Sequence, residues 1–176
     1  MSRLETIILY LLTRAKQRGK DNLSKIELFK LLYLLEVEAY KLTGKTFFDS
    51  TVSFTRDKNG PISATIYHAL NDLDDKYITI NSQQKANYPY PRHCISLKKL
   101  IKKINLQPSE KIFVNSVIEE YLPMTISNLK NVVYNTEPMK KMQEEERQQK
   151  VSVLKGYQID FSSIPMDEDM VDLISA

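Results

Sequence analysis

Residues 23–44 are the most apolar segment of the chain, and their apolar residues do not keep to one face of a helix. Ser24 and Glu27 have the spacing of a capping box at the start of a helix, and Gly44 suits the position just after its end. A surface helix would show one apolar stripe, whereas this segment is apolar nearly all round. We therefore expect a helix that is buried on most sides, with the other elements packed around it.

Shorter elements are predicted on both sides of this helix. Ser2 and Glu5 form a second capping box, which begins an amphipathic helix that Gly19 ends. Residues 51–55 favour a short strand, and Pro61 suits the first turn of a further helix. The other predicted elements are strands at 77–81 and 93–97, a short basic helix or turn at 98–104, helices at 110–122, 128–135 and 138–150, and an extended segment at 156–161.

These elements predict a mainly helical α+β fold. The chain has 176 residues, a length typical of one domain with a core of its own. We expect a single domain over residues 1–150, built around the buried central helix and carrying a small antiparallel sheet or hairpin. Residues 151–176 are expected to form an acidic C-terminal tail.

Charge is distributed unevenly along the chain. The net charge of +3 divides into −5 for residues 160–176 and +8 for the rest. A basic body with an acidic tail can indicate nucleic-acid binding, an acidic protein partner, or a tail that folds onto its own body. The tail also carries apolar residues at helical spacing, so we expect it to dock on the body or on a partner. These residues are Met166, Met170, Val171 and Ile174.

The composition also indicates a compartment. Cys94 is the single cysteine, so no internal disulfide can form, and a reducing cytosol fits the chain. No apolar run reaches the roughly 18 residues that a membrane span requires. The N-terminal segment lacks the small-residue cleavage site of a signal peptide. We therefore expect a cytoplasmic protein without a membrane partner.

The residue patterns of common enzymes are missing. The four glycines have neither the G-x-G nor the G-K-[ST] spacing of a phosphate-binding loop. His93 and Cys94 are adjacent on a predicted strand and point to opposite faces, which disfavours a metal site. A Cys94 nucleophile paired with a histidine is possible in principle, but a small residue filling a sheet face is the favoured interpretation. We expect no enzymatic activity, no metal and no cofactor.

DNA binding is a further alternative, because two helices followed by a hairpin resemble a winged helix. The helix before the hairpin would be the recognition helix. However, residues 61–75 contain no Lys or Arg and three Asp, which phosphates would repel. A winged-helix-like DNA-binding regulator is therefore disfavoured. Basic residues do cluster after the hairpin, where an ordinary solvated face explains them: Lys98, Lys99, Lys102 and Lys103.

Three motifs, two of them in the central helix and one after the predicted strand, carry a family resemblance. The segments are residues 23–45 and 48–70, and they resemble the Panacea domain of SocA-like antitoxins, a family often found in prophages and toxin–antitoxin operons. The family has a K-L-x-K-L-L-Y-x-A helix, a T-G pair at its end, and a G-P-V-x-x-x-x-Y motif after a short strand. The matching residues are Lys25, Phe29, Lys30, Leu31, Leu32, Tyr33, Thr43, Gly44, Gly60, Pro61, Ile62 and Tyr67.

A late motif of the family is only partly kept. The family often has a His and a Pro-Trp pair late in the domain. This chain keeps Pro138 but has Thr136 at the expected His position and Met139 in place of Trp. If that motif contacts the partner, the partner of this chain or its mode of contact differs.

The resemblance implies an antitoxin that neutralises a cognate toxin by direct protein–protein binding. The toxins of the family are diverse, so the resemblance does not identify the toxin. An alternative implied by the same family is an adaptor that delivers the toxin to a protease. The resemblance also implies that six motif residues define the fold: Lys30, Leu31, Tyr33, Gly44, Gly60 and Pro61.

The contact surface for a partner is predicted from residue types. An aromatic residue, an arginine and exposed turn polarity are the mixture enriched at binding hot spots. This mixture occurs between the predicted strand and the helix after it. The predicted partner-binding residues are Phe54, Arg56, Lys58, Asn59 and Tyr67.

Overall fold

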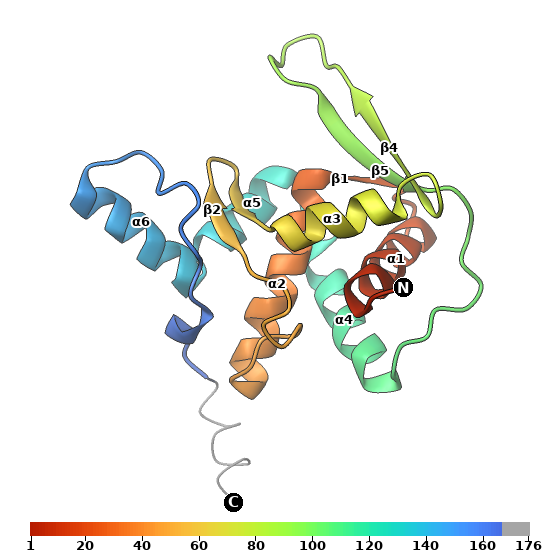
Figure 1. The fold of residues 1–176 in the computed structure, drawn as a ribbon, viewed down its shortest axis with the longest axis horizontal. Coiled ribbons are helices and arrows are strands. Elements are labelled where there is room, and N and C mark those ends of the chain that lie inside the picture. Colours follow the sequence, from red (N-terminus) through yellow and green to blue (C-terminus); the bar gives the residue numbers. More distant parts are fainter. Residues whose placement is uncertain (167–176) are drawn as a thin grey trace, which may run out of the picture. The chain divides into compact units, whose positions relative to one another are not determined.

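The computed structural model describes residues 1–166 (Figure 1). Within them, α-helices are joined by two small antiparallel sheets, which confirms the mainly helical α+β class. The part of the acidic tail after residue 166, with most of its predicted apolar stripe, lies outside the described residues. The elements are α1 (Arg3–Gln17), β1 (Asn22–Ser24), α2 (Lys25–Thr43), β2 (Thr55–Asp57), β3 (Gly60–Ile62), α3 (Ala64–Leu73), β4 (Ile78–Gln83), β5 (Arg92–Leu97), α4 (Pro108–Tyr121), α5 (Ile126–Tyr134), α6 (Glu137–Gln149) and a 3-10 turn (Phe161–Ser163).

The chain divides into two compact units, each made of two separate stretches. Among the described residues, the first unit contains Met1–Leu28 and Ile66–Pro123, and the second contains Phe29–Thr65 and residues 124–166. Residues 151–166, which the sequence assigns to the tail, are thus part of the second unit. Among the helices described, none is long and apolar enough to cross a membrane.

Helix α2 is buried nearly all round, as its sequence predicts. Its apolar residues between Leu28 and Val37 are almost inaccessible, and so are the charged side chains of Lys30 and Glu36. The predicted capping box is also present. The Ser24 hydroxyl accepts a hydrogen bond from the Glu27 amide at 3.2 Å, while the Glu27 carboxylate accepts one from the Ser24 amide at 2.8 Å.

The first unit combines helices α1 and α4 with the three-stranded sheet. The sheet has the order β1-β5-β4 and is antiparallel throughout, and Figure 1 shows β4 and β5 as one long hairpin. Both strands of this hairpin were predicted, whereas the short strand β1 was not. The capping box of α1 is confirmed, because Ser2 accepts from the Glu5 amide and Glu5 accepts from the Ser2 amide. Residues 98–104 form neither helix nor strand.

The second unit corrects the prediction for residues 51–62. The strand begins only at Thr55, and Pro61 lies in β3 opposite Arg56 instead of starting a helix. The reason is that Lys58 and Asn59 close a two-residue turn, so the chain reverses and pairs with itself before α3 begins. Proline is tolerated in β3 because an edge strand does not need every amide as a donor.

The other side of β2 is also paired. The Arg56 amide donates to the Tyr157 carbonyl at 2.9 Å, and the Gly156 amide donates to the Arg56 carbonyl at 2.8 Å. Two residues before Arg56, the Phe54 carbonyl accepts a hydrogen bond from the Ile159 amide at 2.9 Å. Of the extended segment expected at 156–161, residues 157–160 are therefore extended, while Gly156 lies in a turn and Phe161 begins the 3-10 turn. This segment holds Arg56 between two neighbouring chain segments.

Candidate functional site

Charged and aromatic side chains from four elements meet in the second unit. We call this group the Tyr134 cluster and define it by five residues. They are Lys30 of α2, Arg56 of β2, Lys130 and Tyr134 of α5, and Glu146 of α6.

A buried ion pair forms the inner part of the cluster. Arg56 donates from Nε and Nη2 to the two carboxylate oxygens of Glu146, at 2.8 and 3.3 Å, and the two side chains are only 5% and 7% exposed. The Leu154 amide adds a third hydrogen bond to Glu146 at 3.0 Å. Burial opposes ionisation of Glu146, but the hydrogen bonds from Arg56 and Leu154 outweigh it and hold its pKa below the ordinary value. The carboxylate is therefore charged at neutral pH and fully engaged.

Tyr134 connects this ion pair to the β2–β3 turn. Its hydroxyl accepts a hydrogen bond from Arg56 Nη1 at 3.0 Å and donates to the Lys58 carbonyl at 3.4 Å. Its ring lies 5.2 Å from the Arg56 guanidinium carbon and 5.5 Å from Lys130 Nζ, measured to the ring centroid. Both distances are within the range of cation–π attraction.

Lys30 is the most unusual charge in the cluster. Its side chain is buried, with the residue 2% exposed, and its ammonium donates to the Asn59 carbonyl at 2.7 Å. Burial, together with the positive charges of Lys130 and Arg56, lowers the pKa of Lys30 to about 8. Within residues 1–166, no carboxylate lies at ion-pair distance from this ammonium.

Gly60 allows the close approach of Lys30 and Tyr134 to the turn. Its φ angle is +108°, a conformation that residues with a side chain rarely adopt. A Cβ atom there would lie 3.3 Å from Lys30 Nζ and 3.5 Å from Tyr134 Cε2. The glycine of the Gly-Pro motif therefore has a local reason: the backbone angle favours glycine, and a side chain would also crowd the Lys30 ammonium.

Tyr33 joins the helix motif to the late motif. Its hydroxyl and the Thr136 hydroxyl are 2.8 Å apart, and Thr136 in turn donates to the Val133 carbonyl at 2.6 Å. Tyr33 is thus the donor to Thr136. Burial raises the pKa of Tyr33, so it stays neutral. Thr136, which stands where the family often has a His, contacts the motif tyrosine directly.

The predicted contact residues occupy different environments. Phe54 is completely buried against Tyr33, and Arg56 is 4% exposed, so neither is available on the surface of the folded chain. Their interior positions have a simple reason, because an aromatic residue beside an arginine suits an interior ion pair as well as a surface. Lys58 and Asn59 are exposed at the turn, and their role in partner binding stays a prediction.

Tyr67 belongs to the first unit, unlike the other four predicted contacts. It is exposed on α3, and Lys25 Nζ lies 5.6 Å from its ring centroid.

Three members of the Tyr134 cluster were not predicted from the sequence: Lys130, Tyr134 and Glu146. The spacing of Lys130 and Tyr134, four residues apart on one helix, is a weak signal that could have paired them.

Five of the six residues expected to define the fold are buried, and the sixth, Gly44, lies at the end of α2. Leu31, Tyr33 and Pro61 are buried, in addition to Lys30 and Gly60. Gly44 follows α2 with a φ angle of +69°, and its amide donates to the Tyr40 carbonyl at 2.8 Å. Their role as determinants of the fold stays a prediction.

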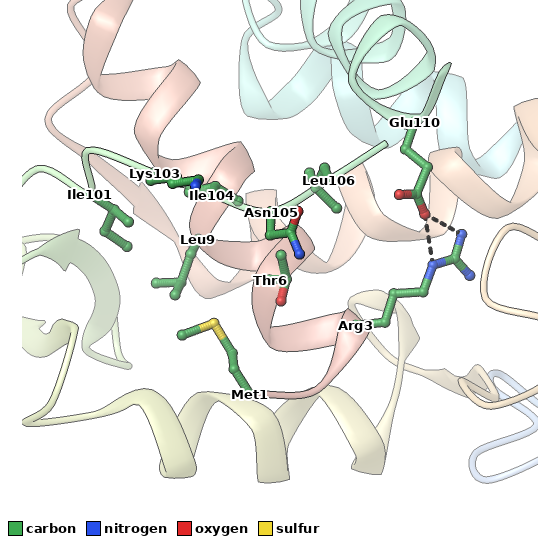
Figure 2. Close-up of a pocket in the computed structure, with 10 residues that line it drawn as sticks. All are labelled: Met1, Arg3, Thr6, Leu9, Ile101, Lys103, Ile104, Asn105, Leu106 and Glu110. Carbon is green, nitrogen blue, oxygen red and sulfur yellow. Dashed lines mark hydrogen bonds and ion pairs between the residues drawn. The ribbon is translucent and has the colours of Figure 1, made fainter. Parts of the chain in front are cut away.

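The first unit contains a cavity of about 470 Å³, which Figure 2 shows between the start of α1 and the loop before α4. Apolar side chains such as Leu9 and Ile101 share its walls with charged ones. Arg3 and Glu110, two charged residues of the lining, pair with each other at 2.9 Å. Among the residues that the structure describes, no three His, Cys, Asp or Glu side chains are grouped to hold a metal ion.

A model of a known protein family matches the chain. The model of the family described as "Antitoxin SocA-like, Panacea domain" matches residues 28–140. No curated protein matches the sequence. The matched stretch begins in α2, includes both strands of the β2–β3 hairpin, and ends in α6. It spans more than half of the chain, and the protein therefore belongs to the SocA-like antitoxin family with a Panacea domain.

Proposed function

We propose that this protein is an antitoxin, which neutralises a cognate toxin by forming a direct complex with it in the cytoplasm. The observation that carries this proposal is the family match over residues 28–140. That stretch supplies Lys30, Arg56, Lys130 and Tyr134, which are four of the five residues of the Tyr134 cluster. All of the cluster except Glu146 thus lies within the stretch that matches the family.

We further propose that the protein acts by binding and not by catalysis. The polar groups of the cluster mostly satisfy one another and the main chain, as Arg56 and Glu146 do. Such an arrangement stabilises a rigid surface, whereas a catalytic site needs groups that converge on a space for substrate. The exposed turn at Lys58 and Asn59 lies directly over the cluster and offers polar groups to a protein partner.

Co-expression tests the proposal. The product of the adjacent gene is expressed alone and together with this chain, while growth and the amount of tagged toxin are followed. An inhibitor restores growth and leaves the toxin level unchanged, and the two purified proteins elute together in size-exclusion chromatography. Failure to restore growth, combined with no complex, would contradict the antitoxin proposal.

The same experiment separates the alternative implied by the family. An adaptor that delivers the toxin to a protease would restore growth by lowering the toxin level. This loss of toxin should disappear in cells that lack the responsible protease. A stable complex with undiminished toxin would therefore exclude delivery as the mechanism.

A further inference from the structure

The Tyr134 cluster carries more positive than negative charge. It contains three cations, Lys30, Arg56 and Lys130, and one carboxylate, that of Glu146, which pairs with Arg56. Arg56 and the Leu154 amide already occupy both oxygens of that carboxylate. Two cations, Lys30 and Lys130, are left without a counter-charge among the residues that the structure describes.

The position of these two cations makes the imbalance costly. Lys30 is held in the interior by the Asn59 carbonyl, and Lys130 lies over the ring of Tyr134 at 5.5 Å. Water screens the charge of the exposed Lys130, but it does not reach the buried ammonium of Lys30 to the same degree. An anion placed beside Lys130 would therefore be attracted by both charges at once.

We propose that the Tyr134 cluster accepts a carboxylate of the protein partner, an Asp or Glu side chain in an acidic segment that binds beside Lys130 and the β2–β3 turn. The proposal rests on the antitoxin function, because the partner in question is the toxin. Lys130 contacts the carboxylate, Lys30 strengthens its attraction from the interior, and Gly60 keeps the turn close to Lys30 and to the ring of Tyr134. This carboxylate supplies a negative charge for Lys30 and Lys130, because the oxygens of Glu146 are already bound by Arg56 and the Leu154 amide.

A protein carboxylate fits this surface better than a nucleic-acid backbone. A nucleic acid presents a long row of phosphates and needs an extended basic track. The same unit exposes acidic side chains on α6, among them Glu137 and Glu144, and Asp57 lies near Lys155 at the hairpin. These groups would repel a continuous row of phosphates, whereas a single carboxylate needs only the Lys130 side of the cluster.

The test uses the full chain and a capped hexaglutamate peptide as probe, with hexaglutamine as the uncharged control. Binding is followed by fluorescence anisotropy of the labelled peptide and by amide chemical shifts of the protein. We expect hexaglutamate alone to bind, with shift changes centred on Asn59, Gly60 and Lys130. Shift changes confined to other residues would overturn the proposal.

A matched pair of charge reversals separates the site from net charge. Lys130→Glu and Lys102→Glu change the total charge equally, and both lysines are exposed, Lys102 in the first unit. Lys130→Glu should weaken peptide binding about fivefold or more, and Lys102→Glu less than about twofold. Equal weakening by both variants would show a general charge effect and overturn the proposal.

In native protein, bound peptide should also raise the titration midpoint of the Lys30 amine above pH 8, and an unchanged midpoint would remove Lys30 from the site.

Two further arms decide between possible occupants. A single-stranded oligonucleotide of equal charge that binds more tightly than hexaglutamate, and loses affinity with Lys130→Glu, would assign the site to nucleic acid and overturn the proposal. The chain's own acidic residues after 166 are the other candidate. If the peptide binds only after these are changed to Asn and Gln in the full chain, the site belongs to that segment and not to a partner.

The toxin itself distinguishes this proposal from the proposed function. If the chain restores growth and Lys130→Glu does so equally well, the antitoxin function stands and the carboxylate site is wrong. If hexaglutamate binds at Lys130 but the chain forms no complex with the toxin and does not restore growth, the antitoxin function is wrong. Loss of rescue by Lys130→Glu but not by Lys102→Glu supports both.

Discussion

Two buried carboxylates, Glu27 in the first unit and Glu146 in the second, hold their charge in different ways. Glu27 is paired with Lys20 at 3.0 Å and Arg92 at 3.1 Å, and the side chains of these two cations are 36% and 32% exposed. Glu146 has one charged partner among the described residues, Arg56, and that side chain is 5% exposed. Both carboxylates also accept main-chain hydrogen bonds, Glu27 from Ser24 and Glu146 from Leu154.

The difference lies in what can replace a lost partner. In both carboxylates burial opposes ionisation, and hydrogen bonds outweigh it, so both pKa values are below the ordinary value. Around Glu27, however, water reaches the cations, and each cation can compensate for the other. Glu146 has neither a solvated cation nor a second cation, because its positive partner among the described residues is one buried arginine. The pKa is thus lowered for both carboxylates, but of the two only Glu146 relies on a single charged partner for this effect.

Removing Arg56 should have the largest effect. Arg56→Ala leaves the Glu146 carboxylate buried and unpaired, and we expect the free energy of unfolding to fall by about 3–5 kcal/mol. Urea denaturation followed by circular dichroism measures it, with the exposed Lys102→Ala as the control. A loss below about 1 kcal/mol would show that Glu146 is hydrated or protonated without cost. The sequence analysis predicted Arg56 as a partner-binding residue, whereas its buried pairing with Glu146 points to a role in stability.

The pH dependence of stability tests the unbalanced charge of Lys30. Below pH 8 the amine is protonated in both states. Between pH 8 and 10.5 the unfolded chain keeps this proton and the folded chain does not, so stability rises with pH. Relative to Lys30→Met, the native chain should gain about 2 kcal/mol between pH 7.5 and 9.5. Chemical denaturation across this range measures the difference, and Lys102→Met should show no such trend. A flat difference for Lys30→Met would mean that a counter-charge balances the ammonium in the folded state, so that the pKa of Lys30 is not lowered.

Glu27→Gln should cost less than the loss of Arg56. Glutamine keeps the shape of the capping box and can still accept from the Ser24 amide, but it loses both ion pairs. Because the two cations can return to water, we expect a loss of about 1–2 kcal/mol in the free energy of unfolding. Glu5→Gln is the matched control, since Glu5 has the same role in the exposed capping box of α1 and should cost under about 0.5 kcal/mol. Equal losses in the two variants would mean that the ion pairs of Glu27 contribute nothing.

The two carboxylates also show what the sequence could predict. The capping box of Glu27 was predictable because its two residues are three positions apart and its chemistry is local. The same holds for the burial of α2, which follows from apolar residues on all its faces. Glu146 lies in a polar segment that was expected to be helical, and its partner Arg56 is 90 positions away in the sequence. No local pattern specifies such a pair.

The error at Pro61 has a related cause. Proline after glycine suits both the first turn of a helix and an edge strand after a tight turn. The choice is made by the partner of the strand, since residues 156–159 pair with the far side of β2 and hold the hairpin extended. The Tyr134 cluster was missed for the same reason, because Lys30 and Gly60 are brought to Tyr134 by chain segments far apart in the sequence.

The smallest predicted effects concern the two cations of Glu27 taken singly. Lys20→Ala or Arg92→Ala alone should lower the free energy of unfolding by about 0.5 kcal/mol, because the other cation remains. The double variant should lose more than the sum of the two, with the excess a measure of how far each compensates for the other. Repeating Arg92→Ala in the Glu27→Gln background removes the carboxylate that both cations share, and there the substitution should have almost no effect. Strict additivity in the first cycle would mean that neither cation of Glu27 compensates for loss of the other. The two carboxylates would then differ only in the solvent exposure of their cations.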